Sequence, residues 1–267
     1  MKRVVLILLT ALFVLCGCGG DGEEGASEKS TVSAEEYALI SQAVQAFNEE
    51  DRREVSVILS LTKGEENAFF TQGGYAYDRG DPIAMSGKTT QVYGDGGSTS
   101  EVFYKAGAYY YSGKDGKFYE SFDRQLFLEQ YLCTNITLCP MESVSGYRRA
   151  ETSAGTKYVL NGAEEKFFKL LFDESLFYYS GLKKPIEEKT EYTDGEFTVV
   201  TDGEGDLVSF SVKCKAVLYD TAPYYPTGYT EGEQKHVLEL SYELSVKALG
   251  DKVEIVVPDT KEYTFLG

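Results

Sequence analysis

Two long stretches of alternating apolar and polar residues constrain the fold of this chain more than any other feature. From Val208 to Leu218 every even-numbered residue is apolar, and most residues between them are Ser or Lys. From Leu238 to Val246 the same alternation separates apolar residues from Glu and Ser. A period of two places successive side chains on opposite faces of a strand. Both stretches are therefore expected to be long antiparallel strands with one buried face.

Shorter segments with the same period are expected to extend this sheet. The alternation from Val55 to Leu61 predicts one strand. Gly73-Gly74 is expected to be a two-residue hairpin turn between strands at 67–72 and 75–78. The other expected elements are a meander at 101–104, 108–111 and 117–120, strands at 147–150, 156–160 and 197–200, a turn at 202–206, and a closing strand with Val253, Ile255 and Val257.

Helical periodicity appears in three places. Ser33 and Glu36 have the spacing of a capping box, and an apolar stripe at spacings of 3, 4 and 3 follows it, so a helix is expected to about Asn48. A short helix is expected at 123–132 and a second main helix from Asn161 to about Gly181. Because helices and strands follow one another without a linker, we expect a single α+β domain at 33–267. The stripe of the first helix consists of Tyr37, Ile40, Val44 and Phe47.

Composition and charge exclude two classes of protein. The 267 residues include 21 Tyr and 15 Phe, and 42% of the chain is hydrophobic, which is too much apolar material for an intrinsically disordered chain. The net charge of -17 has the wrong sign for a protein that neutralises phosphates, so no nucleic-acid partner is expected.

The N-terminus has the pattern of an export signal. Lys2 and Arg3 precede a 12-residue apolar run, 4–15, that is interrupted only by Thr10. As a helix this run would extend roughly 18 Å, which is too short for a bilayer core of about 30 Å. The pattern therefore predicts a cleaved signal peptide and an exported protein.

The residues after this run resemble the lipobox of bacterial lipoproteins. Leu15, Gly17 and Cys18 match an aliphatic residue, a small residue and the modified Cys of that motif. The resemblance implies a signal peptide at 1–17 and a diacylglyceryl group on Cys18, which anchors the protein to the outer face of a bacterial cell membrane. Residues 18–32 are Gly-rich and acidic, as expected of a flexible tether. Cleavage removes two basic residues and no acidic residue, so the net charge changes from -17 to -19.

Three segments of the chain are similar to LolA/LolB-like bacterial lipoproteins. They are the aromatic pair of strands at 101–119, a strand followed by a helix at 155–168, and the ending Ile-Val-Val-Pro-Asp-Thr-Lys-Glu-Tyr at 255–263. Phe118 stands where the family has Trp. The resemblance implies a strongly curved antiparallel half-barrel that is closed by a few helices and encloses an apolar cavity for acyl chains.

The chain contains few residues suited to catalysis or metal binding. His236 is the only His, and its neighbours are polar, so neither a zinc site nor a nucleophile-His pair is expected. Residues 202–206 begin like a calcium loop but lack its later Gly and Glu, and a hairpin turn explains them better. We therefore expect no enzyme activity, no metal and no cofactor.

Cysteines and tyrosines provide the remaining candidate residues. Cys133 and Cys139 could close a small disulfide loop in an exported protein or could remain free thiols, whereas Cys214 is expected to be a buried apolar residue. The loop at 222–229 could pack on itself, form the rim of a cavity or dock a partner. Its aromatic residues are Tyr224, Tyr225 and Tyr229.

Two functions are compatible with these features. The first is a membrane-anchored, non-enzymatic lipoprotein that binds a lipid or another amphiphile in its half-barrel. The second is an accessory lipoprotein of the cell envelope that has a filled core and binds a protein partner. The residues expected to face the cavity, or to fill the core, are Val57, Leu59, Phe103, Tyr110, Phe210, Val212, Leu240 and Tyr242.

Overall fold

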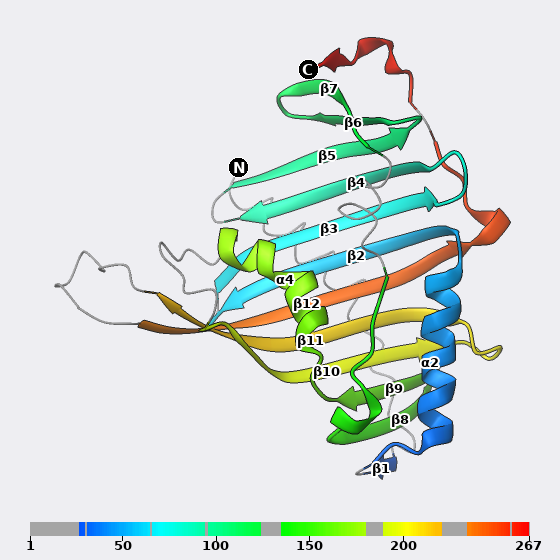
Figure 1. Ribbon diagram of the computed structural model, residues 1–267, viewed down its shortest axis with the longest axis vertical. Coiled ribbons are helices and arrows are strands. Elements are labelled where there is room, and N and C mark those ends of the chain that lie inside the picture. Colours follow the sequence, from blue (N-terminus) through cyan, green and yellow to red (C-terminus); the bar gives the residue numbers. More distant parts are fainter. Residues whose placement is uncertain are drawn as a thin grey trace.

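The computed structural model contains one large sheet with two helices (Figure 1). It describes residues 27–29, 31–64, 66–93, 96–123, 135–179, 189–220, 234–256 and 258–266. The 13 strands have the order β1-β8-β9-β10-β11-β12-β2-β3-β4-β5-β6-β7-β13, and β13 is parallel to β7 whereas all other neighbours are antiparallel. The antiparallel architecture expected from the alternating residues is therefore confirmed.

The strands and helices have the following bounds. The strands are β1 Ser27–Lys29, β2 Arg52–Lys63, β3 Glu66–Asp78, β4 Ala84–Tyr93, β5 Gly96–Lys105, β6 Ala108–Gly113, β7 Gly116–Ser121, β8 Gly146–Thr152, β9 Gly155–Asn161, β10 Glu191–Thr201, β11 Leu207–Asp220, β12 Gln234–Leu249 and β13 Thr264–Phe265. The α-helices are α2 Ala34–Glu49 and α4 Glu165–Tyr179, and the short 3₁₀ helices are η1 Met141–Ser143, η3 Gly250–Lys252 and η4 Thr260–Glu262.

Strands β11, β12 and β2 form the centre of the sheet. Their register places the apolar residues of the three strands opposite one another, for example Cys214, Leu240 and Leu61 in one row. Residues on the other face of these strands are mostly Ser, Lys and Glu, so the two long alternating stretches have one buried and one solvated face as expected. The turn at 202–206 is also confirmed, because Asp202 and Asp206 close the β10–β11 hairpin with a 2.9 Å backbone hydrogen bond.

Both α-helices pack on the same face of the sheet, which we call the helix face; the other is the outer face (Figure 1). Helix α2 begins as expected, since the Ser33 hydroxyl accepts a 3.1 Å hydrogen bond from the Glu36 N–H. Ile40, Val44 and Phe47 then pack in the core together with aromatic residues of α4 such as Phe168.

The expected turn at Gly73-Gly74 is wrong. Both glycines lie inside β3, which pairs continuously with β4 from Phe69 to Asp78. The physical reason is steric, because a Cβ on Gly73 would lie 2.6 Å from the Tyr75 ring. Gly is therefore needed at this position to leave room for the Tyr75 ring, and not to turn the backbone.

Three further expectations need correction. Asn161 ends β9 and α4 begins only at Glu165, because Asn161 pairs with Glu196 in the sheet. The described residues of the expected closing strand at 253–257 do not form a strand; instead the chain runs on to β13, at the edge of the sheet. The range expected to be a flexible tether, 18–32, contains strand β1. This strand pairs with β8 and covers that edge of the sheet.

The C-terminal segment covers an aromatic cluster on the outer face. Phe103 and Tyr110 stack with ring centroids 4.2 Å apart, and Tyr263 contacts both rings edge-on. Tyr119 continues the stack towards Phe265 of β13. These contacts form a second, smaller apolar layer. They explain why β5 to β7 carry aromatic residues on both faces of the sheet.

Candidate ligand-binding face

A row of mainly apolar residues crosses the helix face from β2 to β7. The register aligns one residue from each of six neighbouring strands, and the side chains of Tyr75, Val102 and Tyr111 within this row are only half-buried. This set, called the aromatic row below, consists of Val55, Tyr75, Gly87, Val102, Tyr111 and Phe118.

Tyr75 lies between two glycines that have no side chain to obstruct its ring. Ideal Cβ atoms on Gly73 and Gly87 would approach the Tyr75 ring to 2.6 and 2.5 Å, which is closer than real Cβ contacts. The Tyr75 hydroxyl shares a 2.5 Å hydrogen bond with the Thr89 hydroxyl, and burial raises the pKa of the phenol. The ring therefore lies along the sheet, over Gly73 and Gly87, instead of projecting from it.

On one side the aromatic row borders polar residues of the same face. The next row contains Gly73, Thr89 and Ser100, and the row beyond it contains Thr71, Gln91 and Ser98. The side chains in these two rows are half-buried or exposed, except at the glycine. The helix face thus presents aromatic and polar groups side by side over β3 to β5, as an amphiphilic ligand requires.

On its other side the aromatic row borders a closed, buried row. Tyr77, Met85 and Tyr104 are at most 2% exposed, and Tyr109 is buried beside them. The same row begins on β2 with Arg53, which pairs with Tyr77. This row separates the half-buried aromatic surface from solvent at the strand ends.

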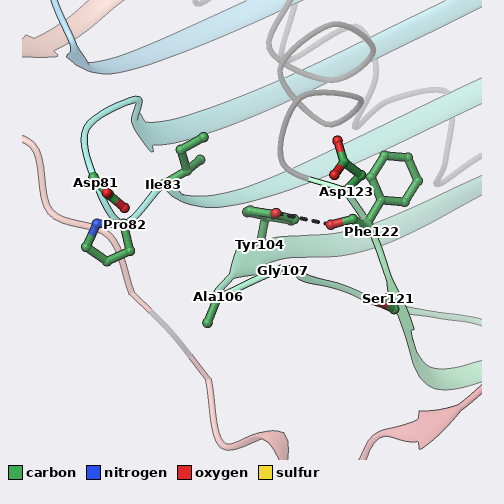
Figure 2. A pocket seen from close by; sticks show the side chains of 9 residues that line it. All are labelled: Asp81, Pro82, Ile83, Tyr104, Ala106, Gly107, Ser121, Phe122 and Asp123. Atoms are coloured by element: carbon green, nitrogen blue, oxygen red, sulfur yellow. Dashed lines mark hydrogen bonds between the residues drawn. The ribbon is translucent and has the colours of Figure 1, made fainter.

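A pocket of about 470 Å³ opens at those strand ends (Figure 2). The Tyr104 hydroxyl donates a 3.2 Å hydrogen bond to the Phe122 carbonyl, which joins β5 to the end of β7. This bond is the dashed line in Figure 2. Ile83 and the ring of Phe122 provide apolar lining, whereas the carboxylates of Asp81 and Asp123 lie at its polar edge.

The part of the helix face over β10 to β2 is filled by the helices. Leu59, Val212 and Leu240 are buried in the same cluster as Phe167 of α4, and Phe210 contacts Phe167 with ring centroids 6.0 Å apart. In this cluster Tyr242 is buried and Val57 is partly buried. Of the eight residues expected to line a cavity, these six lie together on the helix face: Val57, Leu59, Phe210, Val212, Leu240 and Tyr242.

Phe103 and Tyr110 do not belong to this group, and the expectation that they face inward with the other six is wrong. Phe103 pairs with Ser86 and Tyr110 on the outer face, under Tyr263. The segment 101–111 has aromatic residues at consecutive positions, so its sequence does not indicate which residues face inward.

Titratable groups in the core are shielded rather than activated. Burial raises the pKa of the Cys139 thiol to about 11 and that of the Cys214 thiol to about 12, so both are protonated at neutral pH. Burial, followed by a hydrogen bond to the Asp173 carboxylate, raises the pKa of Tyr192. Within the described ranges no three His, Cys, Asp or Glu residues are grouped so that they could hold a metal ion.

Several candidate residues lie outside the described part of the chain. They are Cys18, Cys133, Tyr224, Tyr225 and Tyr229, together with all but the first residue of the helix expected at 123–132. Cys139 is described, with a free and buried thiol. Because Cys133 lies outside the described residues, the pairing of these two cysteines stays a prediction. Across the described residues, no helix is both long and apolar enough to cross a membrane.

The sequence analysis missed Tyr75 and its two glycines. Gly73 precedes Tyr75 by two residues, which places both on one face of a strand, but the adjacent Gly74 suggested a turn instead. The third member, Gly87, is brought next to Tyr75 only by the β3–β4 register.

The sequence and the fold were compared with those of known proteins. No protein-family model matches the sequence, and no curated protein matches it. Among solved structures, the fold is similar to the crystal structure of LprF from Mycobacterium bovis, with a TM-score of 0.42 and 8% sequence identity over 85% of this chain and 99% of that chain.

Proposed function

We propose that this chain is a non-enzymatic, membrane-anchored lipoprotein that binds an amphiphilic molecule on its helix face. The observation that supports this proposal best is the aromatic row, in which Tyr75, Val102 and Tyr111 stay half-buried while the rows on one side of it are polar. An acyl chain on this surface would gain about 0.8 kcal/mol for each methylene removed from water.

The N-terminal sequence supports membrane anchoring. The 12-residue apolar run and the Leu-Cys-Gly-Cys segment ending at Cys18 are those of an exported lipoprotein. Two acyl chains on Cys18 suffice for stable anchoring. The surface of the mature chain, with a net charge of -19, would be repelled by an anionic leaflet, so the lipid would act as the anchor.

A direct test is native mass spectrometry of the mature chain without its lipidated cysteine, residues 19–267, purified without detergent. The proposal predicts a bound amphiphile that organic solvent extracts and that a second mass measurement identifies. Repeated isolation of the bare chain, together with no uptake of added fatty acid, would contradict it.

The alternative function, an accessory protein that binds a partner, is favoured by one other observation. Val256, Phe265 and Leu266 of the C-terminal segment are 71%, 52% and 53% exposed, which places three large apolar side chains in solvent on one segment. Loss of a co-purifying envelope protein on substituting Phe265 and Leu266 by Ser would support this role.

A further inference from the structure

Arg53 is a fully buried cation on the helix face. Its side chain is 0% exposed and lies between two aromatic rings, with its Cζ atom 4.6 Å from the Phe47 centroid and 4.9 Å from the Tyr77 centroid. Burial lowers the pKa of Arg53 to about 10, so the guanidinium is still charged at neutral pH. A buried charge of this kind needs a partner, because desolvation is costly.

The hydrogen bonds of Arg53 are incomplete. In the described part of the chain six buried side-chain polar atoms have no hydrogen-bond partner, and three of them are Arg53 Nε, Arg53 Nη1 and Arg79 Nε. No ion pair within 4 Å joins Arg53 to a carboxylate of the described residues. Its aromatic neighbours stabilise the charge but accept none of these hydrogen bonds.

Arg79, which follows the last residue of β3, lies near Arg53. Its Nη2 donates to the carbonyls of Asn48 and Glu50 at the end of α2, at 2.6 and 2.8 Å, which fixes the guanidinium. Its nearest carboxylate, that of the exposed Asp51, is 3.8 Å from Arg79 Nε. Arg79 is therefore held in place mainly by neutral oxygens.

The two guanidinium groups converge on one uncharged oxygen. Asn135 Oδ1 accepts from Arg53 Nη2 at 3.2 Å and from Arg79 Nη1 at 3.5 Å. Asn135 is an exposed residue that lies outside the helices and strands. Two cations around one neutral oxygen, with further N–H groups unused, are arranged as an anion requires.

We propose that Arg53 and Arg79 form a binding site for a carboxylate or phosphate group, which replaces the amide oxygen of Asn135. Arg53 lies two residues along β2 from Val55, the first member of the aromatic row, and points to the same face. The site would thus hold the charged end of an amphiphile whose apolar part lies on the aromatic row. In this form the inference rests on the proposed function, whereas the anion site itself does not.

Thermal unfolding of the mature chain in inorganic phosphate tests the site, with phosphate replacing chloride at constant ionic strength. At a phosphate concentration ten-fold above Kd we expect the melting temperature to rise by about 3 °C. Arg53→Met should abolish this rise. Arg52→Met is the matched control, because Arg52 is the neighbouring residue, carries the same charge and pairs with Asp78 on the outer face, and it should keep the rise.

Two substitutions of Asn135 should act in opposite directions, which excludes a general loss of folding. Asn135→Asp supplies a permanent carboxylate to both arginines, so it should raise the melting temperature in chloride and remove the response to phosphate. Asn135→Ala empties the position and should lower the phosphate concentration needed for half of the effect. The proposal is overturned if phosphate has no effect on the unsubstituted chain, or if Arg53→Met and Asn135→Asp respond to phosphate as that chain does.

The source of the anion is distinguished by comparing dodecyl phosphate, dodecanol and inorganic phosphate. For the charged end of an amphiphile, dodecyl phosphate should bind at least about ten-fold more tightly than either fragment, and Arg53→Met should reduce its affinity to that of dodecanol. If dodecyl phosphate binds no better than inorganic phosphate, the site takes a free anion; the anion site then stands and the amphiphile function fails. If dodecanol binds but phosphate has no effect, amphiphile binding stands and the anion site fails.

Discussion

The ring of Tyr75 lies against the backbone of Gly87, its partner on the neighbouring strand. A Cβ on Gly87 would be 2.5 Å from Cδ1 of Tyr75 and 3.0 Å from the carbonyl oxygen of Gly74, so neither Ala nor any larger residue fits without movement. This arrangement keeps a large aromatic ring flat on the sheet. The shape of the candidate binding surface at Tyr75 therefore depends on Gly73 and Gly87.

Gly73→Ala and Gly74→Ala should therefore differ, although the residues are adjacent. The first adds a methyl group 2.6 Å from the Tyr75 ring and should destabilise the fold by about 1–3 kcal/mol, and it should weaken amphiphile binding. The second adds a methyl group on the outer face, where the nearest atom is 4.0 Å away, and should be neutral. Urea unfolding of both variants measures the difference; equal effects would contradict the assignment of faces.

Tyr263→Ala should loosen the C-terminal segment. The substitution removes the edge-on contacts with Phe103 and Tyr110 and should cost about 1–3 kcal/mol, because such aromatic pairs contribute beyond their buried area. The control is Glu262→Gln, which breaks only the exposed ion pair with Lys117 and should leave stability unchanged. Faster hydrogen exchange of β6 and β7 in Tyr263→Ala alone would support this account, and unchanged exchange would oppose it.

The buried thiols should make the fold sensitive to alkaline pH. Burial raises the pKa of Cys139 to about 11 and that of Cys214 to about 12, from an ordinary value of 9. Because the folded protein then binds more protons than the unfolded chain, the contribution is complete below pH 9 and is lost as the pH rises towards the folded values. At pH 10 the loss is about 1.4 kcal/mol for each free thiol, so Cys139 contributes only in chains in which it is not paired with Cys133.

Chemical unfolding at pH 8 and pH 10 measures this loss. Cys214→Ala should lower the free energy of unfolding at both pH values, through the smaller side chain, but should reduce the difference between them. An unchanged difference in Cys214→Ala would mean that this thiol does not cause the pH dependence.

Cys18→Ala should release the chain from the membrane fraction. The expectation follows from the charge of the mature chain, which disfavours adsorption to anionic lipid once the acyl chains are absent. Fractionation of cells expressing either form, followed by blotting, measures it. If the variant stays with the membrane, an anchor other than the lipidated Cys18 is required.

The sequence indicated the architecture well where one face of a strand is buried and the other is wet. Val212 and Leu240, with polar residues on either side, could belong only to strands with a buried face, and the structure confirms both. Ser33 likewise marked the start of α2 correctly. These features depend on neighbouring residues and can be read without knowing the register.

The candidate site depends on contacts between distant residues, and these could not be predicted in the same way. Phe103 precedes Tyr104, and Tyr110 lies between two other tyrosines, so only strand pairing decides that Phe103 and Tyr110 face the C-terminal segment. The convergence of Arg53 and Arg79 on Asn135 joins residues 82 and 56 positions apart in the chain. No local pattern indicates such a contact.

The absence of Trp from the chain permits a direct test of ligand binding on the helix face. Phe118 ends the aromatic row, whereas the next residue, Tyr119, lies on the outer face against Tyr110. Phe118→Trp and Tyr119→Trp therefore place a single fluorophore on either face of the same strand. We predict that a brominated fatty acid quenches Trp fluorescence saturably in Phe118→Trp and leaves Tyr119→Trp unchanged. Equal quenching of both variants, or none in Phe118→Trp, would contradict amphiphile binding on the helix face.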